Sequence, residues 1–183
     1  LPMNPPTHTP EVPGAPGGYE LVFGDLHNHT SHSSCSPVRD GNPIDNMRLQ
    51  RDVLGYRVLC IADHQRISDA DFRQRLDLME REATQGHVPI YAIEWNKQPW
   101  QHINFYTYEK EVMKELRQIL LRDLDIHLMF NDIYEKFPDM VMANRHFHDY
   151  GTLGGHGIVG DTHTHLYDPR IEWAMEALHS RGD

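Results

Sequence analysis

The sequence is short of cysteine, of basic residues and of long apolar runs, and each shortage excludes a class of protein. Cys35 and Cys60 are the only cysteines in 183 residues, which excludes a disulfide framework and favours a reducing compartment such as the cytoplasm without fixing the location. No apolar run approaches the roughly 20 residues that a membrane span requires. Lysine and arginine number 17 against 27 acidic residues, which argues against binding of a nucleic-acid backbone. We therefore expect neither a nucleic acid nor a membrane as partner.

Histidine, in contrast, is abundant. The chain has 14 histidines and a formal net charge of −10, a composition that points to metal binding. It has no G-x-S-x-G nucleophile elbow and no obvious cysteine–histidine pairing, so covalent catalysis is not indicated. Its length fits one domain with a core of its own. We expect a small-molecule substrate, and the sequence leaves the oligomeric state open.

The two ends of the chain have a different composition from the middle. Residues 1–18 hold half of the 12 prolines and read as an extended linker, so the domain is expected over residues 19–183. The chain starts at Leu1 and stops just after an expected helix. We therefore expect a fragment whose natural polypeptide continues past Asp183 with at least one more strand.

Between the ends, apolar runs with strand character alternate with amphipathic helical patterns. Asn42 before Pro43 predicts the start of a helix to about Gly55, and Ser68 predicts the cap of a second helix. Expected strands cover 19–23, 56–62, 88–93, 103–107 and 140–143, and further helices cover 109–122, 124–137 and 169–179. This alternation predicts an α/β fold with a mainly parallel sheet or a barrel.

The ionisable residues fall at the ends of these expected strands. In an α/β barrel the carboxyl ends of the strands meet on one face, so residues from five segments would converge there. His27 and His29 would place both rings on one side of an extended segment, with Asp25 holding the first ring. Isolated histidines such as His8, His87, His127 and His156 are expected to be ordinary surface residues. The converging set is Asp25, His27, His29, Asp63, His64, Glu94, His102, His146 and His148.

Three motifs in this set resemble a known family. Gly24-Asp25-Leu26-His27-Asn28-His29-Thr30, then Ala62-Asp63-His64, then Ile93-Glu94-Trp95, resemble the polymerase and histidinol phosphatase (PHP) superfamily of metallohydrolases. The later run Gln101-His102-Ile103-Asn104-Phe105-Tyr106 is most similar to its carbamate-hydrolase-like branch. The resemblance implies a distorted (β/α)7-type barrel, here incomplete at its C-terminal end, with two to three divalent ions of zinc, manganese or iron.

The resemblance also implies roles for individual residues. His27, His29 and Glu94 would bind one metal, and Glu94 would bridge to a second metal held by His102 and His146. His64 would belong to a third metal. The candidate metal ligands are therefore His27, His29, His64, Glu94, His102 and His146, and the candidate catalytic residues are Glu94, Asp25, Asp63 and Arg145, the last as a grip for an anion.

The chain departs from the family pattern in two places. Cys35 stands where many members have a further histidine; it is either a soft ligand or a packed thiol, and nearby His32 is an alternative ligand. The final Asp-x-His of the family is matched only by Asp161 and His163, 15 residues after His146, which leaves no room for a helix and a strand between them. A loop insertion explains that pair better, and the third metal site stays open.

From these observations the sequence predicts a hydrolase in which a metal-activated water attacks a phosphoester. Hydrolysis of a carbamate or a carboxylic ester at the same metals is the nearest alternative. A metal-stabilised binding or structural domain without activity is the alternative from another class.

Overall fold

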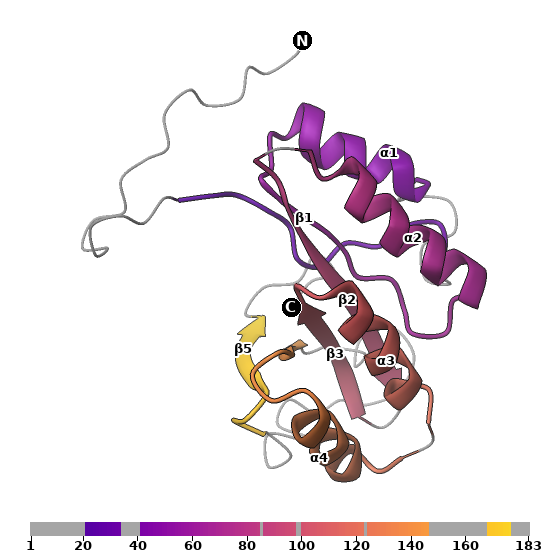
Figure 1. Cartoon of the computed structure of the whole chain (residues 1–183), viewed down its shortest axis with the longest axis vertical. Coiled ribbons are helices and arrows are strands. Elements are labelled where there is room, and N and C mark those ends of the chain that lie inside the picture. The colour runs from indigo at the N-terminus through magenta and orange to yellow at the C-terminus, as the bar shows by residue number, and fades with distance from the viewer. Residues whose placement is uncertain are drawn as a thin grey trace, which may run out of the picture. The chain divides into compact units, whose positions relative to one another are not determined.

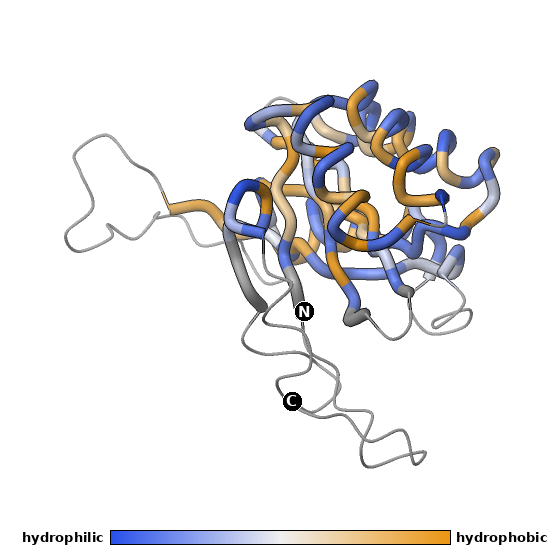
Figure 2. The backbone as a smooth tube through the Cα atoms, turned by 90° about the horizontal axis from the view of Figure 1, so that it is seen from below, coloured by the Kyte–Doolittle hydropathy of each residue, from blue (hydrophilic) through white to orange (hydrophobic). Residues whose placement is uncertain are grey.

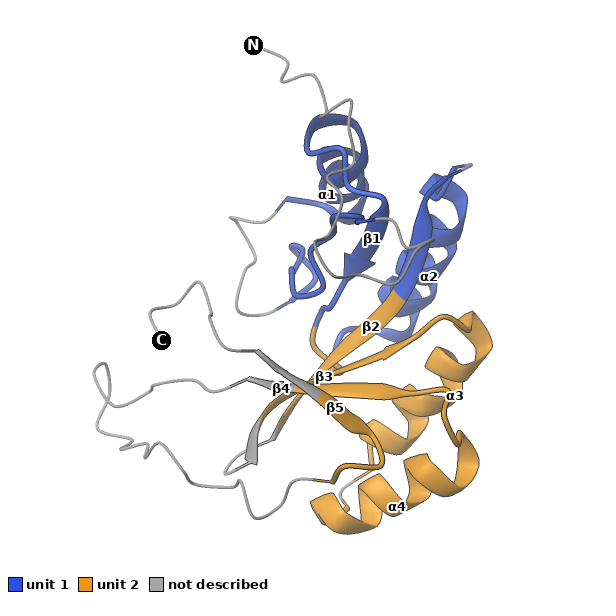
Figure 3. Ribbon diagram, turned by 90° about the vertical axis from the view of Figure 1, so that its left-hand side faces the viewer, with its two compact units in different colours: residues 1–63, 67–90 blue, residues 64–66, 91–183 orange. Residues whose placement is uncertain are grey.

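The fold was analysed in a computed structural model, which describes residues 21–33, 41–84, 86–97, 100–122, 124–146 and 168–176 (Figure 1). Within these ranges the chain is mixed α/β, with four α-helices, one short π-helical turn and five strands. The chain divides into two compact units, residues 1–63 with 67–90 and residues 64–66 with 91–183 (Figure 3). Each unit is described by itself below.

The first unit contains two helices whose start sites follow from the sequence. α1 (Pro43–Arg48) begins after Asn42, whose side chain accepts a hydrogen bond of 2.9 Å from the backbone N–H of Asp45. The helix continues into the π-helical turn η1 (Leu49–Val53), so the expected helix to about Gly55 is confirmed with a change of winding. α2 (Asp69–Glu82) begins after Ser68, whose hydroxyl accepts from the Asp71 N–H at 3.1 Å.

The apolar face of α2 lies in the core of this unit. Phe72, Leu76 and Met79, which recur at helical spacing in the sequence, are all buried. α1 lies beside α2 (Figure 1). The strand β1 (Val58–Ile61) confirms the expected strand over 56–62, and its last three residues are fully buried.

The expected first strand, over 19–23, is not found in its described part. Residues 21–23 are not strand, and only Gly24 pairs with β1, through an isolated parallel bridge to Val58. A Cβ on Gly24 would lie 2.5 Å from the Cβ of Val58, so only glycine allows this close approach. Residues 19 and 20 lie outside the described part of the chain.

The second unit contains two antiparallel strand pairs. β2 (Val88–Lys97) pairs antiparallel with β3 (Trp100–Thr107), and β3 pairs antiparallel with β4 (Met142–His146). The expected strands at 88–93, 103–107 and 140–143 are therefore confirmed, with longer or shifted bounds. Their mainly parallel arrangement was predicted wrongly, because the short link between β2 and β3 leaves no residues for the crossover helix that a parallel pair needs.

Two amphipathic helices complete this unit. α3 (Lys110–Leu120) and α4 (Ile126–Lys136) confirm the helices expected over 109–122 and 124–137, and they contact each other. Hydrophobic and hydrophilic segments alternate along the helical coils in Figure 2, as one buried face requires. α3 also contacts β3.

The helix expected over 169–179 is wrong in its described part. Residues 172–176 form β5 (Glu172–Glu176), which pairs parallel with β4. Glu-Trp-Ala-Met-Glu contains good helix formers, but pairing with β4 and burial of Ile171 and Glu172 override this local preference.

The described strands follow the order β1-β2-β3-β4-β5 in one mixed sheet. Over these residues the sheet is open, so the structure gives the mixed α/β class and not the seven-stranded barrel. Within the same ranges no helix combines the length and the apolar character needed to cross a membrane.

Candidate metal centre

A group of two histidines and one glutamate forms a candidate metal site in the described part of the second unit. Glu94 lies on β2 and is 1% exposed. One of its carboxylate oxygens lies 2.8 Å from His64 Nε2 and the other lies 2.5 Å from His102 Nδ1. One ligand atom from each of the three residues fits within a span of 4.8 Å. Two imidazoles and a carboxylate therefore meet at one point.

Backbone pairing explains why these three residues meet. Glu94 lies directly opposite Asn104 in the antiparallel register, and His102 precedes Asn104 by two residues, so it projects from the same face of β3. His64 follows β1 and forms an isolated parallel bridge with Glu94. The expectation that Glu94 and His102 lie at strand ends was wrong, because both lie within longer strands.

The segment that carries His64 is held by Gln65, which is 2% exposed. The Gln65 side chain donates to the Asn96 carbonyl and accepts from the Asn96 N–H, each at 3.2 Å, as a neighbouring strand would. The Gln65 N–H also donates to the Glu94 carbonyl at 2.9 Å, and Arg117 on α3 donates to the Gln65 carbonyl at 3.2 Å. His64 is therefore anchored through its neighbour.

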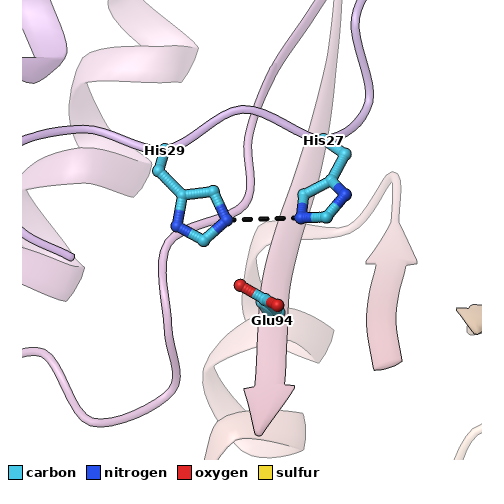
Figure 4. A group of neighbouring side chains, drawn as sticks. All are labelled: His27, His29 and Glu94. Atoms are coloured by element: carbon cyan, nitrogen blue, oxygen red, sulfur yellow. Dashed lines mark hydrogen bonds between the residues drawn. The ribbon is translucent and has the colours of Figure 1, made fainter. Parts of the chain in front are cut away.

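The first unit holds the His27–His29 pair. Their Nε2 atoms lie 3.3 Å apart and the ring centroids 5.3 Å apart, and the rings turn toward each other in Figure 4. Figure 4 also labels Glu94 on its strand. The carboxylate of Asp25 accepts a hydrogen bond of 2.9 Å from the backbone N–H of His27. The two imidazoles thus present nitrogen atoms at the spacing of ligands to a common ion.

The backbone between the two histidines is tied to β1. The Asn28 side chain donates to the Cys60 carbonyl at 2.7 Å, and the Asn28 carbonyl accepts from the Ala62 N–H at 2.8 Å. Gln50 on η1 donates to the Cys60 carbonyl at 2.9 Å and accepts from the Cys60 N–H at 3.2 Å. This irregular segment is therefore fixed mainly by side-chain hydrogen bonds.

Asp63 is fully buried in the first unit. Burial by itself would raise the pKa of its carboxyl group, but the charge of Arg75 and hydrogen bonds from Thr30 and Ser33 outweigh burial and lower the pKa. Asp63 is therefore ionised at neutral pH. The thiol of Cys60 is also buried, and burial raises its pKa, so this cysteine is not a reactive thiolate.

The remaining predicted residues are placed only in part. His146 lies opposite His102 in the β3–β4 register, and Arg145 lies opposite Ile103, but their side chains fall outside the described part. Cys35, His148, Asp161 and His163 also lie outside the described residues. His32 is described, lies 3.9 Å from Asp71, and belongs to neither histidine group. The catalytic roles of Asp25 and Arg145 stay predictions.

Asn104 is a residue of this region to which the sequence analysis gave no role. It is fully buried directly opposite Glu94, and neither atom of its side-chain amide has a hydrogen-bond partner among the described residues. Two-residue alternation from His102 could have placed it on the metal-binding face. Gln50 and Gln65 carried no sequence signal, because ordinary glutamines are common on surfaces.

The donor set fits a divalent transition metal. Imidazole nitrogen suits zinc, iron and manganese, and two histidines with one carboxylate leave coordination positions open for water or substrate. The negative charge of Glu94 offsets part of the cation charge in a site that water reaches poorly.

Comparisons of the chain with protein-family models, with curated proteins and with solved structures give no significant match. The resemblance to the PHP superfamily therefore depends on the motif residues alone.

Proposed function

We propose that this protein is a metal-dependent hydrolase that uses a metal-activated water, most simply on a phosphoester. The observation that carries the proposal is the buried carboxylate of Glu94 between the imidazoles of His64 and His102. A buried carboxylate needs compensating positive charge, and a divalent cation at this point would supply it.

The chemistry follows from the donor set. A divalent cation bound there supplies a Lewis acid that lowers the pKa of a coordinated water toward neutrality. His64 and His102 would hold the cation through imidazole nitrogens, and Glu94 would supply the anionic oxygen. Gln65, through its bonds to the Asn96 backbone, keeps His64 next to β2. No protein nucleophile is needed in this scheme.

The resemblance extends the proposal to two or three metals. In that scheme Glu94 is shared with the His27–His29 pair, and His146 completes the ligands around His102. The convergence of His27 and His29 within their own unit supports one half of this arrangement, and the register of His146 with His102 supports the other. Arg145 remains the proposed grip for an anionic substrate.

Turnover of model substrates tests the proposal. The full chain, loaded with Mn²⁺ or Zn²⁺, is assayed with an aryl phosphate and with the matching aryl ester, and Glu94→Gln is the inactive reference. We expect metal-dependent turnover of the phosphate, lost in Glu94→Gln and kept in His87→Ala, whose imidazole lies within hydrogen-bond distance of the nearby Thr84.

Two other results would replace the proposal. Faster turnover of the aryl ester would favour a carbamate or carboxylic ester hydrolase at the same residues. Metal binding without turnover of either substrate would favour a metal-stabilised binding or structural domain.

A further inference from the structure

The carboxylate of Asp63 has polar contacts on all sides within the first unit. Its Oδ1 accepts from the Thr30 N–H at 2.7 Å and from the Ser33 hydroxyl at 2.8 Å. Its Oδ2 accepts from the Thr30 hydroxyl at 2.9 Å and lies 3.4 Å from Nη1 of Arg75. Since Asp63 is also 0% exposed, its carboxylate has no surface that a substrate can reach.

The positive partner comes from a different element. Arg75 lies on α2, is 0% exposed, and places its guanidinium 5.3 Å from the centroid of the Phe72 ring. A carboxylate buried without a countercharge would be strongly unfavourable. The charge of Arg75 thus allows the Asp63 carboxylate to remain ionised while it is buried against the segment that carries His27 and His29.

That acceptor holds one peptide group in particular. The N–H of Thr30 belongs to the peptide bond that links His29 to Thr30, and the carbonyl of the same bond accepts from the Asn46 side chain at 3.4 Å. Thr30 itself is fully buried. With both ends of this peptide group bonded, the backbone of His29 has little freedom to rotate, so the Cα–Cβ bond that carries the ring leaves the segment in a fixed direction.

We propose that Asp63, paired with Arg75, is the positioning residue of the His27–His29 pair and not a catalytic group. This inference rests on the proposed function, because the pair matters to activity only if it binds metal. The test of the inference does not depend on the proposed function. Asp63 acts through Thr30: it sets the 3.3 Å spacing of the two imidazole nitrogens before any ion binds. Removal of one acceptor oxygen should therefore disturb both rings.

The test replaces Asp63 with asparagine, which keeps the shape but turns one acceptor oxygen into an N–H donor facing the Thr30 and Ser33 donors. Asp77→Asn, the same change on the exposed side of α2, is the matched control. Imidazole ¹H–¹⁵N spectra of the metal-free full chain report the tautomers of His27 and His29. Zn²⁺ titration reports affinity.

We expect Asp63→Asn to change the His27 and His29 signals, to leave those of His64 and His102 unchanged, and to weaken Zn²⁺ binding by about 10- to 100-fold at the His27–His29 pair. Asp77→Asn should change neither. Unaltered His27 and His29 signals in a folded Asp63→Asn would overturn the proposal. Since the rings are read without metal, this result does not depend on whether the protein is a hydrolase.

Two further variants cover the case in which Asp63→Asn does not fold because it removes the negative charge beside the buried Arg75. The double variant Asp63→Asn with Arg75→Met removes both charges, and we expect it to recover the melting temperature but not the His27 and His29 signals. If the double variant recovers both the melting temperature and the His27 and His29 signals, the ion pair is purely structural and the proposal is wrong. Thr30→Val removes one bond to Asp63 and keeps the side-chain shape. A smaller shift of the same two signals is expected, and no shift would contradict the proposal.

Discussion

The two histidine groups are held in place by different means. In the second unit, Glu94 and His102 lie on paired strands, and the register of β2 with β3 decides that they share a face. In the first unit, His27 and His29 lie on irregular backbone, and side chains hold the segment, among them Asn28, Gln50 and Asp63. Backbone pairing tolerates most substitutions, whereas a side-chain network can be lost through one. The geometry of the His27–His29 group should therefore be disturbed more easily by a single substitution than that of the His64–Glu94–His102 group.

Each unit nevertheless uses one similar device. A buried glutamine carboxamide pairs with both the N–H and the carbonyl of a strand residue, Gln50 with Cys60 in the first unit and Gln65 with Asn96 in the second. Among the described residues, each glutamine extends a strand edge as a neighbouring strand would.

The largest effect is expected from the ligand itself. Glu94→Gln keeps the side-chain volume but removes the anionic donor between His64 and His102. We expect loss of divalent-metal binding at this group, measured by Zn²⁺ titration of the full chain. Zn²⁺ binding equal to that of the unchanged chain would show that Glu94 is not a ligand.

The two glutamines form a matched pair. Gln65→Leu removes the partner of the Asn96 N–H and carbonyl. Gln50→Leu removes the partner of the Cys60 N–H, while the Cys60 carbonyl keeps its bond from Asn28. Each change should cost about 1–3 kcal/mol in the free energy of unfolding. Urea denaturation measures this cost. Gln50→Leu should shift the His27 and His29 signals and Gln65→Leu that of His64. If either variant shifts only the histidine signals of the other unit, the two glutamines do not support the histidine groups of their own units.

Acid should act on the first unit through Asp63. Its pKa in the folded protein lies below the value in the unfolded chain, so its contribution to stability is present above about pH 4 and is lost as the pH falls through the folded pKa. Thermal melts between neutral and acidic pH measure the loss. Asp63→Asn with Arg75→Met should show a shallower decline than the unchanged chain, and an equal decline would assign the acid sensitivity to other groups.

The smallest effects are expected at the helix ends, where the two units can be compared directly. Ser68 caps α2 and Asp125 caps α4, each through a bond to a backbone N–H. Ser68→Ala and Asp125→Ala should each cost about 1 kcal/mol. Urea denaturation checks the cost, and neither change should alter any of the four histidine signals. A shifted signal would show that the site depends on helix ends as well.

The sequence predicted the parts of the fold that depend on local chemistry. Asn42 and Ser68 cap helices in the structure, and the buried face of α2 follows from the spacing of Phe72, Leu76 and Met79. The sequence-based prediction was wrong where pairing between strands determines the structure. The run from Glu172 to Glu176 contains good helix formers, yet it forms a strand because β4 offers a parallel edge. The antiparallel order of β2, β3 and β4 is also a property of pairing.

The candidate site shows the same division. The resemblance implied that His64, Glu94 and His102 are metal ligands, with His64 at a different metal from the other two. The structure brings all three together in one group. Their supports were not predicted, because Gln65 and Arg117 gain their roles only from partners distant in the sequence. Asp63 was predicted as a catalytic residue from its position beside His64, and its burial became visible only in the folded chain.

Elemental analysis of the full chain, purified without chelator, measures whether the two histidine groups and Glu94 bind divalent metal. We expect about two divalent ions per chain, in line with a two-metal hydrolase, and fewer in Glu94→Gln. A protein that contains no metal after purification, and takes up neither Mn²⁺ nor Zn²⁺ when they are added, would contradict this expectation.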